Sequence, residues 1–176
     1  VIDVSDPFAP QARGTLVLPG SPTNIAIAGA IAYVSSTDNV SELQIISIAN
    51  PDNPILLGVF NAPGAADGRG VDAVGTTAYL TRSASAAQDF FIVDASNPSA
   101  PTGLGKELGT NALEVAVVGN YAYLASVLDA GELQVIDTTN LALPVINVNL
   151  PGNSDALSIA GFPATIVLGR NDGALY

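Results

Sequence analysis

The residues best suited to bind a polar ligand lie in a glycine-rich stretch, Ala62–Gly70, which carries Asp67 and Arg69 with Asp72 just beyond it. An acid and a base two positions apart can hold a polar group between opposite charges. The same stretch is also typical of a solvated glycine turn, which is the commoner role of such a sequence. It is therefore a candidate binding loop, and replacing it with a short turn is expected to abolish binding while leaving the fold intact.

The residue types used for catalysis are scarce. The chain has no histidine, cysteine, methionine or tryptophan, so the commonest general base and all thiolate chemistry are missing. Serines are plentiful, but Gly-x-Ser-x-Gly, Ser-x-x-Lys and Gly-x-x-x-x-Gly-Lys motifs are absent. Hydrolysis by paired carboxylates would need acids brought together from distant parts of the chain. We therefore predict a non-enzymatic protein without a cofactor.

Metal and nucleic-acid binding are also disfavoured. Calcium needs several oxygen ligands within a short loop, and no such cluster occurs in the sequence. We interpret the acids as turn formers at Asp38-Asn39, Asp129 and Asn171-Asp172-Gly173. A formal net charge of −11 repels phosphate backbones and anionic lipid. Without an apolar run approaching 18 residues, no membrane insertion is expected within the chain.

The elements that must position these residues come from a repeat. An apolar run followed by a polar turn and two prolines recurs around Asp3, Ser47, Asp94 and Asp137, at spacings of 44, 47 and 43 residues, with Leu141 in place of the first proline in the fourth copy. Three of these positions are aspartates and the fourth is a serine. Both side chains can accept hydrogen bonds from backbone amides of the turn that follows. A residue repeated in every unit is better explained by architecture than by a single active site.

Each repeat contains four short apolar runs separated by turn residues. In the second repeat these runs are 24–28, 30–34, 42–48 and 55–60, rich in β-branched and aromatic residues. Four antiparallel strands in 40–50 residues are typical of a β-propeller blade, so we predict an all-β propeller with about four repeats. A β-sandwich or a solenoid is the alternative with the same strand content.

The first two runs of each repeat share a glycine, an alanine three residues later and a tyrosine after that, at Gly29/Ala32/Tyr33, Gly75/Ala78/Tyr79 and Gly119/Ala122/Tyr123. The glycine is expected to supply a positive φ, the alanine to fit between closely packed sheets, and the tyrosine to point its hydroxyl toward water. The last copy, Gly161–Thr165, contains a proline that would remove a ladder hydrogen bond, which predicts an edge or an irregular hairpin.

Leu133–Asp137, Phe91–Asp94, the double-proline turns and the hairpin Gly119–Tyr123 together resemble the LVIVD-repeat family. The resemblance covers the whole chain in about four copies, with the fourth degraded. It implies a propeller-like fold and an extracellular or cell-surface setting. The family has no agreed catalytic motif, so the resemblance implies little about chemistry.

The repeat divides this single propeller segment into blade-like units at 1–23 (partial), 24–62, 70–108, 113–150 and 156–176 (partial). Both ends fall inside a third strand, and joining Leu175-Tyr176 to Val1-Ile2-Asp3 would restore the repeat. Either four blades close on themselves, or the chain belongs to a longer array of about six to eight blades, which we favour. Self-association through the terminal strands is a further expectation.

Ligands of propellers usually bind at the mouth of the central channel, on loops that enter the first strand or join the second and third. This places a protein- or glycan-binding face on the residues Asp67, Arg69, Arg82, Asn111 and Asp155. The expected function is that of a binding module or scaffold. The alternative is the blade array of an exported enzyme whose catalytic residues lie outside these 176 residues.

Overall fold

The computed structural model describes residues 1–83 and 88–176, and within them the chain forms sixteen strands. They are β1 (Ile2–Asp3), β2 (Gln11–Ala12), β3 (Pro22–Ala28), β4 (Ile31–Ser36), β5 (Leu43–Ser47), β6 (Ile55–Phe60), β7 (Gly68–Val74), β8 (Thr77–Arg82), β9 (Phe90–Asp94), β10 (Thr102–Lys106), β11 (Ala112–Val118), β12 (Tyr121–Ser126), β13 (Leu133–Asp137), β14 (Ile146–Val148), β15 (Ala156–Phe162) and β16 (Thr165–Arg170). The predicted loop Arg82–Gln88 lies partly outside the described residues, at 84–87.

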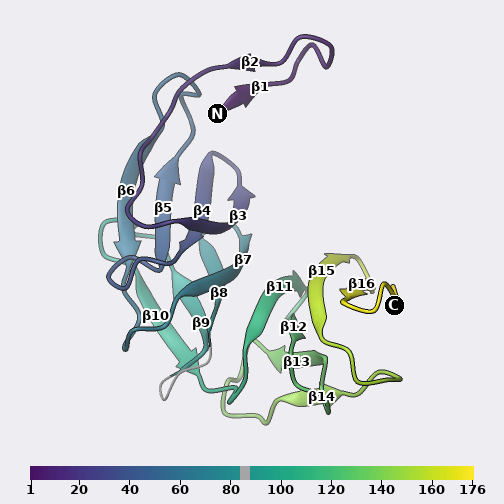
Figure 1. Ribbon diagram of the computed structural model, residues 1–176. Helices are drawn as coiled ribbons and strands as arrows, with labels where there is room; N and C mark the ends of the chain where they lie inside the picture. The colour runs from purple at the N-terminus through teal and green to yellow at the C-terminus, as the bar shows by residue number, and fades with distance from the viewer. Residues whose placement is uncertain (84–87) are drawn as a thin grey trace.

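The strands form consecutive antiparallel sheets. Three have four strands in sequence order, β3–β6, β7–β10 and β11–β14, while β1–β2 and β15–β16 are two-stranded. Figure 1 shows the sheets in an arc, with β3, β7, β11 and β15 toward its middle and β6, β10 and β14 at its rim. The predicted all-β propeller of four-stranded blades is therefore confirmed.

The first hairpin of each complete blade turns on a glycine. Gly29, Gly75 and Gly119 have φ of 60°, 60° and 61°, each at the first position of a two-residue turn. A positive φ there matches the twist of the flanking strands, and glycine adopts it without steric cost. The predicted role of these glycines is confirmed.

The β15–β16 hairpin reaches the same connection with different residues. It is a separate two-stranded sheet, so the expected edge position is confirmed, whereas the expected loss of a ladder hydrogen bond is wrong. Pro163 occupies the first turn position, outside the strand ladder, so it removes no ladder hydrogen bond. Because the proline ring holds φ negative, the positive φ moves to the second position, where Ala164 has φ 64°. The pairing of β15 with β16 is regular from Phe162↔Thr165 back to Ser158↔Gly169.

The cores lie between sheets, because a blade has apolar side chains on both faces. In the first complete interface, Tyr33, Leu43 and Ile45 of one sheet pack with Ala78, Leu80, Phe91 and Val93 of the next. Alanines 32, 78 and 122 are buried, as expected for positions between closely packed sheets. Equivalent clusters join the later sheets.

Tyr33 corrects the expected orientation of the tyrosines. Its side chain is fully buried, and its hydroxyl donates to the Gly75 carbonyl of the next blade at 3.2 Å. Burial raises the pKa of the Tyr33 hydroxyl. This tyrosine therefore joins two blades and does not point toward water.

The recurring aspartates anchor turns, as predicted. The carboxylates of Asp3, Asp94 and Asp137 each accept a hydrogen bond from the amide two residues later, at 2.8–2.9 Å. Hydrogen bonding from Ser96 and Ser5 lowers the pKa of Asp94 and Asp3, and hydrogen bonding from Thr139 does the same for Asp137. The repeated acid thus has a structural role in each turn.

These turns make folding stability depend on pH. Because the folded-state pKa of these carboxyls lies below the ordinary value of an unfolded chain, the stabilisation is present above that ordinary value and is lost as pH falls through the folded pKa. We expect the urea midpoint of a D3N/D94N/D137N variant to fall less steeply below about pH 4 than that of the wild type. If the urea midpoints of the two proteins fell equally steeply at acid pH, this role would be contradicted.

Candidate functional site

The four loops that enter the inner strands are held in the same way in successive blades. The carbonyls of Ser21, Asp67, Asn111 and Asp155 each accept a hydrogen bond from the backbone amide just after the second strand, at 2.9–3.2 Å. Three of the predicted site residues therefore occupy one equivalent position at the same end of the propeller. All three are partly exposed, and the Asp155 carboxylate also accepts a hydrogen bond from Asn171 at 3.2 Å.

Arg69 lies at this end on β7 and is exposed. The other four cationic side chains are all engaged: Arg13 with Asp3 and Asp52, Arg82 with Glu42, Lys106 with the carbonyls of Leu141 and Leu143, and Arg170 with those of Pro151 and Ser154. Within the part of the chain that the structure describes, the guanidinium of Arg69 makes no hydrogen bond or ion pair. It is the cation left available to a ligand.

Glycines 68 and 70 determine how Arg69 is presented. A Cβ on Gly70 would lie 2.6 Å from Glu114 Cα, and one on Gly68 would lie 2.6 Å from the Glu42 carbonyl oxygen. Side chains at these two positions would therefore collide with neighbouring backbone. The Ser35 hydroxyl also donates to the Arg69 carbonyl at 2.9 Å. The backbone around Arg69 is packed tightly while its side chain points into solvent.

Arg82 does not belong to the binding face, which corrects our prediction. Its side chain is 0% exposed and forms an ion pair with the equally buried Glu42 of the preceding blade, at 3.0 Å. It also donates to carbonyls of the entry loop, at Pro63, Gly64 and Ala66. Arg82 holds the 62–70 loop against two blades. Replacing that loop would remove the carbonyls of Pro63, Gly64 and Ala66 from the buried guanidinium. The loop therefore cannot be exchanged without affecting the fold.

The same residue types recur two interfaces further along, although there the arginine forms its ion pair with Asp172, at 3.4 Å. Glu132 and Arg170 occupy the positions of Glu42 and Arg82, and both are buried. Arg170 donates to Pro151 and Ser154, as Arg82 does to Pro63 and Ala66. Glu132 Oε1 and Arg170 Nη2 are buried without a hydrogen-bond partner in the described residues. The β3–β6 and β11–β14 blades carry Ser36 and Ser126 at the position of the arginine. The arginine is therefore present in every second blade.

Residues of the inner strands contact one another at the middle of the arc. The repeat pattern did not predict these contacts. Glu114 accepts hydrogen bonds from the Asn24 side chain at 3.2 Å and from the Ile159 amide at 2.8 Å. Its Cα lies against Gly70, so this one residue touches the inner strands of the three other sheets. Asn24 and Glu114 occupy equivalent positions beside a β-bulge, a signal visible in aligned repeats. Their meeting across the arc depends on tertiary structure.

The inner-strand carboxylates are engaged in structural contacts. Asp72 accepts a hydrogen bond from the Val117 amide at 2.7 Å, much as Glu114 accepts one from Ile159. Each acid thus satisfies a backbone donor of the following inner strand. Among the residues described here, no three Asp or Glu side chains gather so as to hold a metal ion. In the same residues, no helix is long and apolar enough to cross a membrane.

Comparison with known proteins identifies the repeat. A family model described as LVIVD repeat matches residues 19–62, 84–106 and 109–150. No curated protein sequence matches the chain.

Solved structures with the same fold are distant in sequence. The computationally designed protein Ika4 is 11% identical with a TM-score of 0.70, over 94% of this chain and 95% of its own. The designed protein Ika8 is also 11% identical, with a TM-score of 0.67, over 88% of this chain but only 44% of its own. A glutaminyl cyclase from Myxococcus xanthus is 15% identical with a TM-score of 0.51, over 88% of this chain and 69% of its own. These likenesses establish the fold alone.

The buried pair leads to a stability prediction. Replacing Arg82 with methionine leaves the Glu42 carboxylate buried without its counter-ion, which typically costs about 3–5 kcal/mol. We expect R82M to lower the free energy of unfolding by that amount, as measured by urea titration. The control R69M removes an exposed arginine from the same hairpin and should change it by less than about 0.5 kcal/mol. Equal effects of the two substitutions would contradict the structural role of Arg82.

Proposed function

The chain belongs to the LVIVD-repeat family, and from this premise we propose that it is a non-enzymatic binding segment and scaffold whose partner docks on the entry-loop face. This face is defined by Asp67, Arg69, Asn111 and Asp155. We further propose that it acts at the cell surface or outside the cell, as the family resemblance implies. The blades supply the rigid frame, and the loops at one end supply the contacts.

The observation that carries the proposal is the unpaired guanidinium of Arg69. On a chain of net charge −11, four of the five basic side chains are engaged in internal contacts, whereas Arg69 is held out toward solvent. A guanidinium binds carboxylates in a two-pronged geometry that a compact ammonium group does not match. Asp67, partly exposed two residues earlier, offers acceptors for hydroxyl or amide hydrogens.

These groups define the chemistry of the partner. It should present a carboxylate to Arg69 and neighbouring hydroxyl or amide donors to Asp67. Acidic protein side chains and uronic-acid sugars both offer this combination. The acidic surface would repel polyphosphates, so nucleic acid is not proposed as a partner. An enzymatic role gains no support, because Asp72 and Glu114 are committed to backbone amides.

The glycan form of this proposal can be tested on an array of neutral and uronic-acid-containing glycans. We expect the wild-type chain to bind uronic-acid members, and R69A to weaken binding at least about tenfold, the effect of losing one charge-assisted contact. The control R13A removes an arginine that lies outside the entry-loop face, just after β2, and should bind like the wild type. R69A with wild-type affinity, or a wild-type chain that binds no glycan on the array, would contradict the glycan form.

A further inference from the structure

The inner strands β3, β7, β11 and β15 each contain a β-bulge at the same place. In every case the register with the second strand of the blade shifts near the start of the inner strand. A bulge adds a residue to one strand and changes the direction of its side chain, and bulges are common beside active sites. Taken at equivalent positions, the residues added by the four bulges are Thr23, Arg69, Leu113 and Leu157.

Successive bulges pack against one another. The Thr23 hydroxyl donates to the Gly68 carbonyl at 2.9 Å, which joins the first bulge to the second. A Cβ on Gly70 would lie 3.0 Å from the Leu113 carbonyl oxygen, so the backbone of the second bulge lies directly against that of the third. Arg69 and Leu113 are therefore neighbours across the interface between two inner strands, although 44 residues separate them in sequence.

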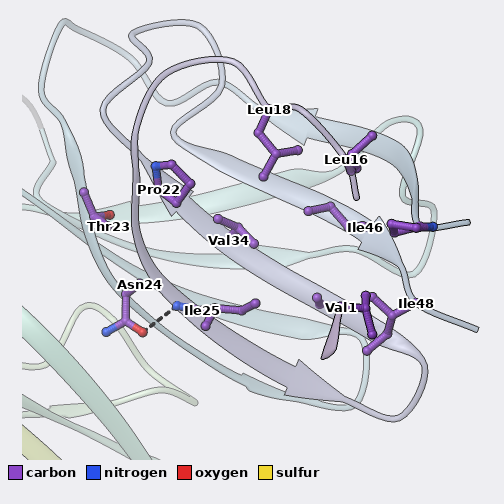
Figure 2. A pocket seen from close by; sticks show the side chains of 12 residues that line it. Val1, Leu16, Leu18, Pro22, Thr23, Asn24, Ile25, Val34, Ile46 and Ile48 are labelled. Atoms are coloured by element: carbon purple, nitrogen blue, oxygen red, sulfur yellow. Dashed lines mark hydrogen bonds between the residues drawn. The ribbon is translucent and has the colours of Figure 1, made fainter. Parts of the chain in front are cut away.

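Hydrogen bonds of the first bulge also support the backbone of Arg69. Figure 2 shows Thr23 and Asn24 at the edge of an apolar pocket, with the side-chain oxygen of Asn24 accepting a hydrogen bond from the Ile25 amide at 2.6 Å. On the strand beside them, the Ser35 hydroxyl donates to the Arg69 carbonyl at 2.9 Å. The position of the arginine backbone is thus set by contacts with the preceding blade.

The bulge residues form a second row beside the entry-loop face. Each lies two positions after a residue whose carbonyl holds an entry loop, and these four residues are Ser21, Asp67, Asn111 and Asp155. We call the set Thr23, Arg69, Leu113 and Leu157 the bulge row. All four members are at least partly exposed. A partner that docks on the entry-loop face therefore also meets the bulge row.

The bulge row combines a cation with apolar side chains. The guanidinium of Arg69 has no partner within the described residues, while Leu113 is half-buried and Leu157 is 48% exposed. The blades of Arg69 and Leu113 each have a described sheet on both sides, so the surroundings of these two residues are defined. A partner that offered only a carboxylate would leave the leucines uncovered, whereas an apolar group placed on them adds favourable burial.

We propose that the partner of this face is a peptide segment whose carboxylate binds Arg69 while a nearby apolar side chain packs on Leu113 and Leu157. This inference rests on the proposed function and states which carboxylate-bearing partner matches the face best. Side chains two residues apart on an extended peptide point to the same side. A segment of the type Glu-x-Leu therefore presents both groups to the bulge row together.

The surrounding charges favour a segment with a single acid. Asp67 and Asp155 each lie two residues before a member of the bulge row, on a chain of net charge −11. They repel further carboxylates, so a run of acids should bind less well than one acid among neutral residues. The same two carboxylates can accept hydrogen bonds from amides of the peptide backbone.

A uronic-acid glycan matches only part of this surface. Its carboxylate can bind Arg69, but its hydroxyl-bearing ring has no alkyl side chain to cover the leucines. Sugars pack their C–H faces mainly on aromatic rings, and the bulge row contains no aromatic residue. We therefore expect both kinds of partner to bind through Arg69, and the peptide to bind more tightly.

The direct probe is the peptide acetyl-Gly-Ser-Glu-Ser-Leu-Ser-Gly-amide, titrated into ¹⁵N-labelled protein and followed by NMR through the Arg69 Nε–H signal and the Leu113 amide. We expect it to bind at least about fivefold more tightly than a control with serine in place of leucine. A control with glutamine in place of glutamate should bind at least about tenfold more weakly. Equal affinities of the leucine and serine peptides would overturn this inference and leave the proposed function intact.

Variants of the protein test where the apolar side chain packs. L113A should bring the leucine and serine peptides to within about twofold of each other, because the apolar contact is lost while Arg69 remains. L157A should reduce the same preference, so the test does not depend on the folding of one variant. The control L104A removes a 72% exposed leucine from the outer strand β10 and should behave like the wild type. An unchanged preference in both L113A and L157A would contradict this placement.

Methyl β-glucuronide separates this inference from the proposed function. It carries a carboxylate without an alkyl side chain, so it should bind more weakly than the leucine peptide and equally well to the wild type and to L113A. If the glucuronide binds and the peptides do not, the inference fails while the glycan form of the proposed function stands. If neither the peptides nor the glucuronide perturb the Arg69 signal, the proposed function fails as well.

Discussion

A four-stranded sheet with apolar residues on both faces cannot bury them within itself, and the rest of this structure follows from that constraint. The β7–β10 and β11–β14 blades are each covered on one face by the blade before and on the other by the blade after. Each interface is therefore formed by side chains of two neighbouring blades. What each interface requires is a match between the facing surfaces, such as the Tyr33 hydroxyl donating to the Gly75 carbonyl.

The polar contacts between blades follow the same rule. Glu42 and Arg82 come from neighbouring sheets, and the arginine also donates hydrogen bonds to carbonyls of an entry loop. Glu114 accepts hydrogen bonds from two further sheets at the middle of the arc. Because these charged groups serve as ties between blades, they are not available to ligands. Arg69 differs, because its guanidinium has no internal partner in the described residues, and this contrast is the reason for proposing it as a contact residue.

Much of the fold could be predicted from the sequence because its signals are local. The glycines of the hairpins, the turn aspartates and the order of four strands each depend on residues close together in the chain. Pro163 was assigned to the strand because Gly161 was matched to the turn glycines, two residues before the position that the turn occupies in the structure. Of the residues predicted to contact a partner, Asp67, Asn111 and Asp155 share one structural position and Arg82 is buried, while their binding role stays a prediction.

The sequence by itself determined the repeat, the number of strands in each unit and the residues that make each turn, because these depend on contacts within about 45 residues of chain. Only the tertiary structure decided which polar side chains are buried. An arginine at the end of a second strand can point to solvent or to a glutamate. Which of the two it does depends on the distance and angle of the neighbouring sheet, and local sequence patterns do not determine these. The same reason applies to Ile25, which shares its place in the repeat with Val71 and differs only in having no sheet against it.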